Sequence, residues 1–437
     1  MRRSPSPAGR VGSPQSELEP PRIRGALFAK PRFLVLVLQV AFVGAVVGTE
    51  RTVLPVLAES EFGLASKTAV LSFILAFGLA KAPANLLAGR LADRFGRKRV
   101  LVLGWIIGLP APLLIAFAPS WSWVIGANLL LGVQQGFCWS TTIFMKVDLA
   151  GVRRGGFAIG VNEFFGYAAT AVAAYTTGVL AAHHGPRVAP FLLGARLAVA
   201  GLVSAIFLVK ASPVPRDPAS TGSGRAGAKP SFFALSQAGF VIKLGDVATW
   251  GMLPLYFTQR GASITTVGLL AAAYPAAWAL LQPLTGRISD HKGRRTPIVV
   301  GMALQGVALV ALALGDSVAQ WLPALVLLGS GTALAYPVLL AAAGECVDAS
   351  QRATAIGLYR LWRDLGFVGG ALLVGIAADA VGVRTTLALL GVVAAVSGVI
   401  VRMSVRAALG PEAEPVSVLA DRLATRASQE SPRPLAP

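Results

Sequence analysis

Charged residues are scarce in this sequence. Of its 437 residues, 14% are Asp, Glu, Lys or Arg, whereas a soluble globular domain carries about 25%. The chain is 55% hydrophobic, and its mean hydropathy is +0.67. This composition excludes an ordinary water-soluble domain and predicts a protein that crosses a membrane many times.

Cysteine and histidine are also rare. Cys138 and Cys346 lie in or beside apolar runs and have no CxxC partner, so neither a disulfide framework nor a zinc site is predicted. The adjacent pair His183-His184 cannot share one helix face, which disfavours a metal site. Because the sequence contains no nucleophile–base constellation, we expect neither an enzyme nor a cofactor.

Acidic residues are few relative to basic ones. The chain has 20 Asp and Glu against 39 Lys and Arg, and its formal net charge is +19. In a soluble protein such an excess indicates nucleic-acid binding. Here the basic residues cluster at the ends of apolar runs, where they orient membrane spans, so a nucleic-acid partner is excluded.

Long apolar segments are abundant. Continuous runs of this length form membrane-spanning helices and lack the alternation of a barrel strand. We predict an all-α polytopic membrane protein with twelve transmembrane helices in two six-helix pseudo-repeats. The predicted parts are a basic N-terminal tail (1–32), a first six-helix bundle (33–209), a linker (210–231), a second bundle (232–405) and a C-terminal tail (406–437).

One short stretch occurs twice. Gly89-Arg-Leu-Ala-Asp-Arg-Phe-Gly-Arg-Lys-Arg99 returns 197 residues later as Gly286-Arg-Ile-Ser-Asp-His-Lys-Gly-Arg-Arg295. A signal that repeats in type, spacing and setting indicates an internal duplication. We expect the glycines to permit a tight reversal of the chain, and Asp93 and Asp290 to accept hydrogen bonds from the backbone at the start of the next helix.

Lysine and arginine also indicate the orientation. Sixteen of them fall in the loops on the side of the repeated stretch, and four fall in the loops on the other side. Basic loops face the cytoplasm in most membrane proteins. We therefore expect both termini and both copies of the stretch to be cytoplasmic, in a plasma membrane.

The duplicated loop, the twelve spans and the central linker resemble the major facilitator superfamily. The resemblance covers residues 33–405. It implies a rocker-switch carrier whose central cavity is lined mainly by spans 1, 4, 7 and 10. Two features depart from the drug/proton antiporters of the superfamily: span 5 lacks proline, and Gly132 occupies the position where they carry arginine in span 4.

Ionisable residues within spans are costly and usually functional. Glu163 and Arg360 lie at equivalent places in the two halves, 197 residues apart and near the membrane midplane. Glu163 is our first candidate for proton coupling, with Arg360 as its partner or as a substrate contact. A fixed salt bridge between the two remains the alternative.

Further candidates lie in the same central spans. Lys243 and Asp246 share one helix face, so Asp246 is either a second proton site or simply neutralised by Lys243. Glu50, in span 1, is a third proton-coupling candidate. The aromatic candidates either stack on an organic substrate or pack in the core. The substrate-binding candidates are Arg360, Lys243, Gln134, Gln135, Asn162, Trp139, Tyr336 and Tyr359.

Charged residues at the cytoplasmic ends of the spans are gating candidates. Asp148 before Arg154, and Glu345 before Arg352, resemble the Glu-x6-Arg charge relay of sugar porters. Such ion pairs either lock an inner gate or form a solvated loop network. The gating set is Gly89, Asp93, Gly96, Arg97, Gly286, Asp290, Gly293, Arg294, Asp148, Arg154, Glu345 and Arg352.

The sequence thus predicts a secondary active transporter that moves a small organic molecule by alternating access, as proton-coupled efflux. The alternative is an uptake symporter for an organic anion, since basic residues outnumber acidic ones among the span candidates. A distant alternative is a non-transporting membrane sensor. The expected partners are a small-molecule substrate, a proton or other coupling ion, and the lipid bilayer, and we expect a monomer.

Overall fold

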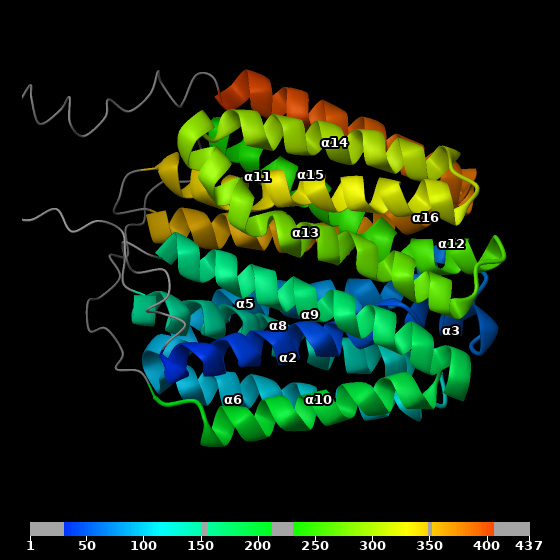
Figure 1. Ribbon diagram of the computed structural model, residues 1–437, viewed down its shortest axis with the longest axis horizontal. Helices are drawn as coiled ribbons and strands as arrows, with labels where there is room; N and C mark the ends of the chain where they lie inside the picture. The colour runs from blue at the N-terminus through cyan, green and yellow to red at the C-terminus, as the bar shows by residue number, and fades with distance from the viewer. Residues whose placement is uncertain (1–29, 151–154, 212–229, 348–351, 406–437) are drawn as a thin grey trace, which may run out of the picture.

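The computed structural model describes residues 30–150, 155–211, 230–347 and 352–405. Within these ranges the chain is helical and contains no strand. The helices run roughly parallel to the long axis of the molecule (Figure 1). The protein is therefore an all-α bundle, as its apolar runs predict.

The first half of the chain forms six membrane-crossing segments. Four of them are single helices, and the first and third are each divided into two helices. Their helices are α2 (Pro31–Arg51) with α3 (Leu54–Ser60), α5 (Ser72–Phe95), α6 (Arg97–Gly108) with α7 (Ala111–Ala116), α8 (Trp121–Ala150), α9 (Gly155–His184) and α10 (Val188–Phe207). The short helix α4 (Lys67–Val70) precedes α5.

The second half repeats this pattern. One long helix, α16, contains Gly382 with φ of 81°, a non-helical conformation at which the helix divides into two spans. The helices are α11 (Pro230–Val247), the π-helix η3 (Ala248–Met252) with α12 (Leu253–Gln259), α13 (Ile264–Lys292), α14 (Arg295–Leu314), α15 (Val318–Glu345) and α16 (Arg352–Ser404).

Twelve membrane crossings follow from these helices. Nine helical stretches in the described ranges are long and apolar enough to cross a membrane, and one of them is the divided helix α16. The 30-residue helix α8 and the continuous run from α11 to α12 supply the other two. The structure thus agrees with the predicted twelve spans.

Spans 1 and 7 break at equivalent places. Pro55 follows the break between α2 and α3, and Pro254 follows the π-helical turn η3. A proline has no N–H to donate and its ring clashes with the carbonyl four residues before it, so each helix is interrupted just ahead of its proline. Both breaks lie beside buried charged residues, which is where irregular backbone occurs in transporters.

The two halves lie side by side. Figure 1 shows the first-half helices α2, α5, α6, α8, α9 and α10 as one layer and the second-half helices α11 and α13–α16 as the other. Helices α9 and α13 pack closely across the interface, where a Cβ on Gly178 would lie 2.8 Å from the Cα of Gly268. Small residues let membrane helices approach this closely.

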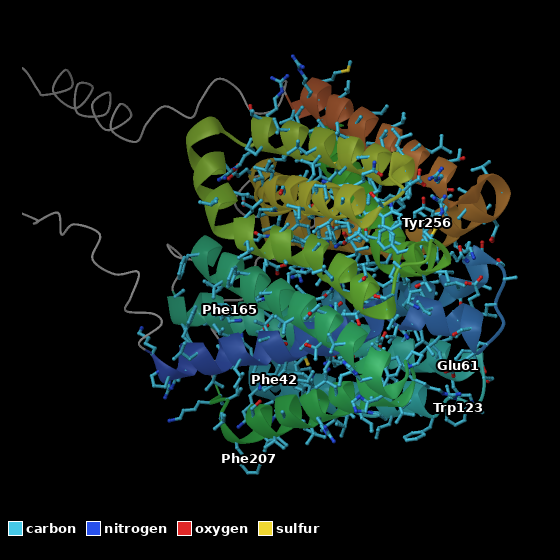
Figure 2. All side chains as sticks on the ribbon, turned by 45° about the vertical axis from the view of Figure 1, so that its right-hand side comes forward. Phe42, Glu61, Trp123, Phe165, Phe207 and Tyr256 are labelled. Atoms are coloured by element: carbon cyan, nitrogen blue, oxygen red, sulfur yellow. The ribbon has the colours of Figure 1, made fainter. Side chains whose placement is uncertain are left out.

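The outside of the bundle is apolar. Exposed side chains such as Phe207, Val172 and Leu280 leave two thirds or more of their surface uncovered, which suits a surface that faces lipid acyl chains. Figure 2 shows Phe207 at one end of the bundle, and Glu61, Trp123 and Tyr256 near the other. We call the end that carries Arg97 and Arg294 the basic end, and the end that carries Glu61 the distal end.

The repeated stretches turn the chain at the basic end. Gly96 and Gly293 have φ of 89° and 72°, and each ends a long helix, α5 or α13. The expected cap by Asp93 is not formed: α5 continues through Phe95, so Asp93 lies in its last turn, and α6 begins without a side-chain cap. Gly89 and Gly286 lie inside helices and take no part in the reversal. Asp290 also lies inside α13, and its side chain falls outside the described set.

Candidate functional site

A ring of polar side chains joins the two halves at mid-length. Asn85, on α5, donates a hydrogen bond to Asp364 of α16, and its carbonyl oxygen accepts one from Ser140 of α8 at 2.9 Å. Arg360, one turn before Asp364 on α16, donates to the Ser140 hydroxyl at 3.0 Å. Arg363 forms an ion pair with Asp364 at 2.7 Å. These side chains form a polar contact between the two halves. Interfaces between membrane helices are otherwise mostly apolar at this depth.

Arg360 and Glu163 therefore bind different partners. Arg360 reaches Ser140, as described, whereas Oε1 of Glu163 accepts a hydrogen bond from the indole N–H of Trp139 at 2.7 Å. The carboxylate is buried, with 4% of its surface exposed. Its second oxygen, Oε2, has no hydrogen-bond partner among the described residues. The repeat gives the two residues equivalent places in the halves, but among the described residues they form no direct ion pair with each other.

A buried lysine lies beside Glu163. The ammonium group of Lys146, on α8, donates to the side-chain oxygen of Asn162 at 2.7 Å, and Thr142 donates to the same oxygen at 3.0 Å. Lys146 has no exposed surface. Its charge also interacts with the neighbouring Glu163 carboxylate. Sequence reasoning missed Lys146, although the rule that intramembrane charges are functional applies to it directly.

A second acidic centre lies in the second half. Asp246, on α11, forms an ion pair with Lys243 and accepts a hydrogen bond from the hydroxyl of Tyr274 on α13. Asp246 and Lys243 are both fully buried. The ammonium group of Lys243 also lies 5.2 Å from the Trp278 ring centroid and 5.3 Å from that of Tyr336. Of the two alternatives for Asp246, the structure shows neutralisation by Lys243. Sequence reasoning missed the additional partner Tyr274.

The two helix breaks meet across the interface. The guanidinium carbon of Arg51, at the end of α2, lies 4.1 Å from the ring centroid of Trp250 in η3 and 5.3 Å from that of Phe77. Such cation–π contacts help to hold the buried guanidinium group, whose charge also interacts with the adjacent Glu50 carboxylate. The neighbouring Glu50 is buried, and its Oε1 has no hydrogen-bond partner in the described ranges.

The remaining binding candidates divide into two groups. Tyr336 lies in the centre, where its hydroxyl accepts a hydrogen bond from Arg363 at 2.7 Å and its ring packs edge-on against Trp278. Gln134 packs against Gly108 of α6 in the first half, and the hydroxyl of Tyr359 packs against Gly239 of α11 in the second half. Both residues thus make packing contacts within their own half. Gln135 is buried on α8, and its side-chain oxygen has no partner among the described residues.

The gating candidates form matching ion pairs at the basic end. Arg97 pairs with Asp148 in the first half, and Arg294 pairs with Glu345 at 3.0 Å in the second half. The four residues are equivalent in pairs under the repeat of 197 residues. Each carboxylate thus contacts the arginine of its own repeated stretch, and each pair stays within one half. Arg154 and the Arg352 side chain lie outside the described set.

A carboxylate joins the halves at the distal end. Asp379, on α16, accepts hydrogen bonds from the hydroxyl of Ser66 at 2.7 Å and from the backbone N–H groups of Lys67 and Thr68 at 2.5 and 3.0 Å. The Thr68 hydroxyl donates a fourth, at 2.7 Å. Asp379 therefore caps α4 of the first half from the second half. Sequence reasoning missed it because the residue lies near a span end, where a carboxylate is common.

A second distal contact accompanies it. The amide of Gln259, at the end of α12, donates to both oxygens of Glu59 on α3, at 2.9 and 3.0 Å. The hydrogen bonds that the described residues make between the halves thus lie at mid-length and at the distal end. The basic-end pairs remain within their halves.

The described residues contain no group of three or more His, Cys, Asp or Glu side chains that could hold a metal ion. The centre of the molecule instead combines carboxylates, ammonium and guanidinium groups with aromatic rings. These groups can bind an organic molecule, exchange a proton with it or with water, and change partners when the halves move.

Comparison with known proteins decides the family. The family model of the Major Facilitator Superfamily matches the chain twice, over residues 36–242 and 235–427. The chain belongs to the major facilitator superfamily. Its two matches correspond to the two halves of the structure, so this is a multi-pass membrane transporter of that superfamily.

Relatives and solved structures agree with this assignment. The chain is 25% identical over 309 residues to the multi-drug resistance efflux pump PmrA homolog of Lactococcus lactis, covering 68% of this chain and 76% of that protein. It is 27% identical over 384 residues to the MFS-type transporter YddS of Bacillus subtilis, covering 82% and 87%. A bacterial homolog of the human lysosomal transporter Spinster, in an inward-facing and occupied conformation, shares the fold with a TM-score of 0.69 at 17% identity, covering 86% and 97%.

Proposed function

We propose that the protein exports a small organic compound across the plasma membrane in exchange for protons, with Glu163 as the coupling acid. The observation that carries the proposal is the environment of this carboxylate. It is buried near the interface between the halves, one oxygen is held by Trp139, and the other has no hydrogen-bond partner in the described ranges. We take the open oxygen as the place where a proton or a cationic group of the substrate is held during transport, because ionisable groups inside a membrane protein are usually functional.

The proposed direction rests on the relatives. The printed name of the Lactococcus lactis relative is that of a multidrug efflux pump. At 25% identity this name supports efflux for the present chain without specifying a substrate. The basic end, with its arginine-rich loops, would face the cytoplasm.

Movement of the halves would couple the two processes. We propose that the bundles 33–209 and 232–405 rock about the central ring of Asn85, Ser140, Arg360 and Asp364. In this state the Asp379 cap holds the distal gate closed. Opening that gate would break the cap and bring the basic ends together, where Arg97 and Arg294 would exchange their carboxylate partners.

A second candidate function is transport of an organic anion. The centre holds four buried acidic side chains (Glu50, Glu163, Asp246 and Asp364) and six basic ones, of which four are buried (Arg51, Lys146, Lys243 and Arg363) and two are half-buried (Lys81 and Arg360). An anionic substrate would balance this excess of positive charge. The observation favours an anion as the cargo and leaves the direction open, so uptake remains the alternative to export.

The proposal is tested with purified protein in proteoliposomes. A panel of cationic, neutral and anionic organic compounds is offered under a pH gradient of either sign, and the flux of each compound is measured. Export coupled to protons predicts accumulation against the compound's own gradient when the proton gradient runs the opposite way. Flux in the same direction as the protons would support the symporter instead, and flux unaffected by the gradient would contradict coupling.

A further inference from the structure

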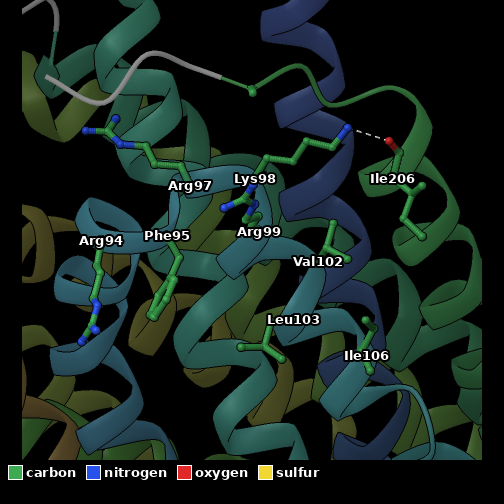
Figure 3. Close-up of a pocket in the computed structure, with 11 residues that line it drawn as sticks. Arg94, Phe95, Arg97, Lys98, Arg99, Val102, Leu103, Ile106 and Ile206 are labelled. Carbon is green, nitrogen blue, oxygen red and sulfur yellow. Dashed lines mark hydrogen bonds between the residues drawn. The ribbon is translucent and has the colours of Figure 1, made fainter.

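A cleft opens on the outer surface of the first half, at the basic end. Its volume is about 790 Å³, and it lies away from the interface between the halves. Residues of the repeated loop, α6 and the end of α10 form its walls (Figure 3). Neither the central site nor the gating pairs account for it.

The rim of the cleft is basic. Arg94, Lys98 and Arg99 line it, and the arginines are both exposed. Lys98 donates to the backbone carbonyl of Ile206 on α10 at 2.7 Å, which ties the loop to that helix (Figure 3). Arg97 also lines the cleft, but its guanidinium group pairs with Asp148.

The wall below the rim is apolar. Val102, Leu103 and Ile106 follow Arg99 at intervals of three, four and seven residues, so the four residues share one face of α6. Leu103 and Ile106 have 43% and 53% of their surfaces exposed. At a rise of 1.5 Å per residue, Ile106 lies roughly 10 Å deeper along the helix than Arg99. This distance carries the cleft from the headgroup region into the hydrocarbon of a bilayer.

We propose that this cleft binds an acidic phospholipid. The headgroup phosphate contacts Arg94, Arg99 and the remaining N–H donors of Lys98, and one acyl chain lies against Val102, Leu103 and Ile106. Charge complementarity selects an anionic headgroup, and the apolar wall selects a lipid over a soluble phosphate. Because the lipid bridges α6 and α10 beside the turn at Gly96, it stabilises the first half at its basic end.

The test is a lipid titration of the purified, detergent-solubilised protein, followed by native mass spectrometry. Phosphatidylglycerol and phosphatidylcholine are compared, with glycerol 3-phosphate as the soluble anion. We expect phosphatidylglycerol to bind more tightly than phosphatidylcholine and glycerol 3-phosphate not to bind. Equal affinity for the two lipids, or binding of glycerol 3-phosphate as tight as that of phosphatidylglycerol, would overturn the proposal.

Two variants and a matched control assign the site. Arg94→Ala with Arg99→Ala removes two rim charges, and we expect a loss of phosphatidylglycerol affinity of roughly five-fold per charge. Leu103→Trp keeps every charge but fills the space beside the apolar wall, so it should lower the affinity for both lipids. Arg32→Ala with Arg402→Ala removes two exposed charges at the same end but outside the cleft. If the control loses as much phosphatidylglycerol affinity as the variant without Arg94 and Arg99, the lipid does not bind in this cleft. The same conclusion follows if neither cleft variant changes the affinity.

Discussion

Gly96 ends α5 in a backbone conformation that glycine alone adopts readily. Its φ of 89° and ψ of 142° lie in a region that costs other residues about 1–3 kcal/mol. A Cβ at this position would meet no atom within 4 Å, so the cost of a substitution is one of backbone conformation alone. Gly96 therefore determines how α5 turns into α6, and with it the position of Arg97.

We predict that Gly96→Ala destabilises the protein by about 1–3 kcal/mol. Gly89→Ala is the matched control, because Gly89 lies inside α5 with open space around it. There alanine should stabilise the helix by about 0.5–1 kcal/mol. Thermal unfolding of the two purified variants measures the difference. A melting temperature that falls equally in both would show that the turn needs no glycine.

Arg360 is the residue at which an anionic substrate would be recognised. Its planar guanidinium group can donate two parallel hydrogen bonds to a carboxylate or phosphate, whereas a lysine ammonium cannot. We predict that Arg360→Lys raises the KM for an anionic substrate about tenfold, the loss of roughly one charge-assisted hydrogen bond. Arg402→Lys, an exposed residue far from the centre, should leave KM unchanged. An unchanged KM in Arg360→Lys would indicate that Arg360 serves only to hold Ser140.

Sequence spacing predicts equivalent positions in the two halves, but not the partners of the side chains at those positions. The repeat of 197 residues gives Glu163 and Arg360 equivalent places, near the start of α9 and of α16. Which partner each side chain meets depends on helix rotation and on neighbours such as Trp139 and Ser140. Those neighbours come from tertiary packing, which spacing alone does not encode. Lys146 could have been found by the same rule that selected Glu163.

At the scale of the elements, spans 1 and 7 break at equivalent places in the two halves. Pro55 and Pro254 mark the breaks, but proline alone does not predict them, because α5 continues through Pro83 and α15 through Pro323 and Pro337. The π-helical turn η3 and the contact of Arg51 with Trp250 could not be predicted either, because they depend on how the two broken spans face each other. The broken spans bring charged and aromatic groups together at the interface.

Helix α4 is held by the other half of the molecule. Oδ2 of Asp379 accepts three of the four hydrogen bonds, and Oδ1 accepts the one from the Lys67 N–H group. Because a neutral amide retains one acceptor oxygen and carries no charge, Asp379→Asn should lose at least the bond from Lys67 and weaken the other three. Hydrogen bonds to a charged group contribute about 1.5–3 kcal/mol each. We predict that Asp379→Asn shifts the population tenfold or more toward states open at the distal end.

Distances between spin labels on α3 and α12, measured by double electron–electron resonance, report this shift. Asp316→Asn is the matched control. Asp316 is an exposed carboxylate at the same end, and its partners Arg260 and Arg384 both belong to the second half. The same distance distribution in Asp379→Asn and Asp316→Asn would contradict the role of Asp379 as a lock between the halves.

At the scale of the whole molecule, the duplication organises the structure. The two copies of the loop place Arg97 and Arg294 against Asp148 and Glu345 in the same way. The two family matches follow the same division. The fold could therefore be predicted from apolar runs and one repeated motif, because both are local signals. The hydrogen bonds that the described residues make between the halves could not be predicted, because each joins residues that lie 200 or more positions apart in the sequence.

Glu163 is the residue proposed to couple proton movement to transport. The most direct test of this role measures Glu163→Gln in proteoliposomes, in two assays on the same preparation. Gradient-driven accumulation needs the proton, whereas exchange of labelled for unlabelled substrate needs only binding and alternation. Glutamine imitates the protonated acid, so the variant should lose accumulation and keep exchange. Glu61→Gln, a carboxylate at the distal end paired with Arg187, should keep both. Accumulation by Glu163→Gln at the wild-type level would contradict the account.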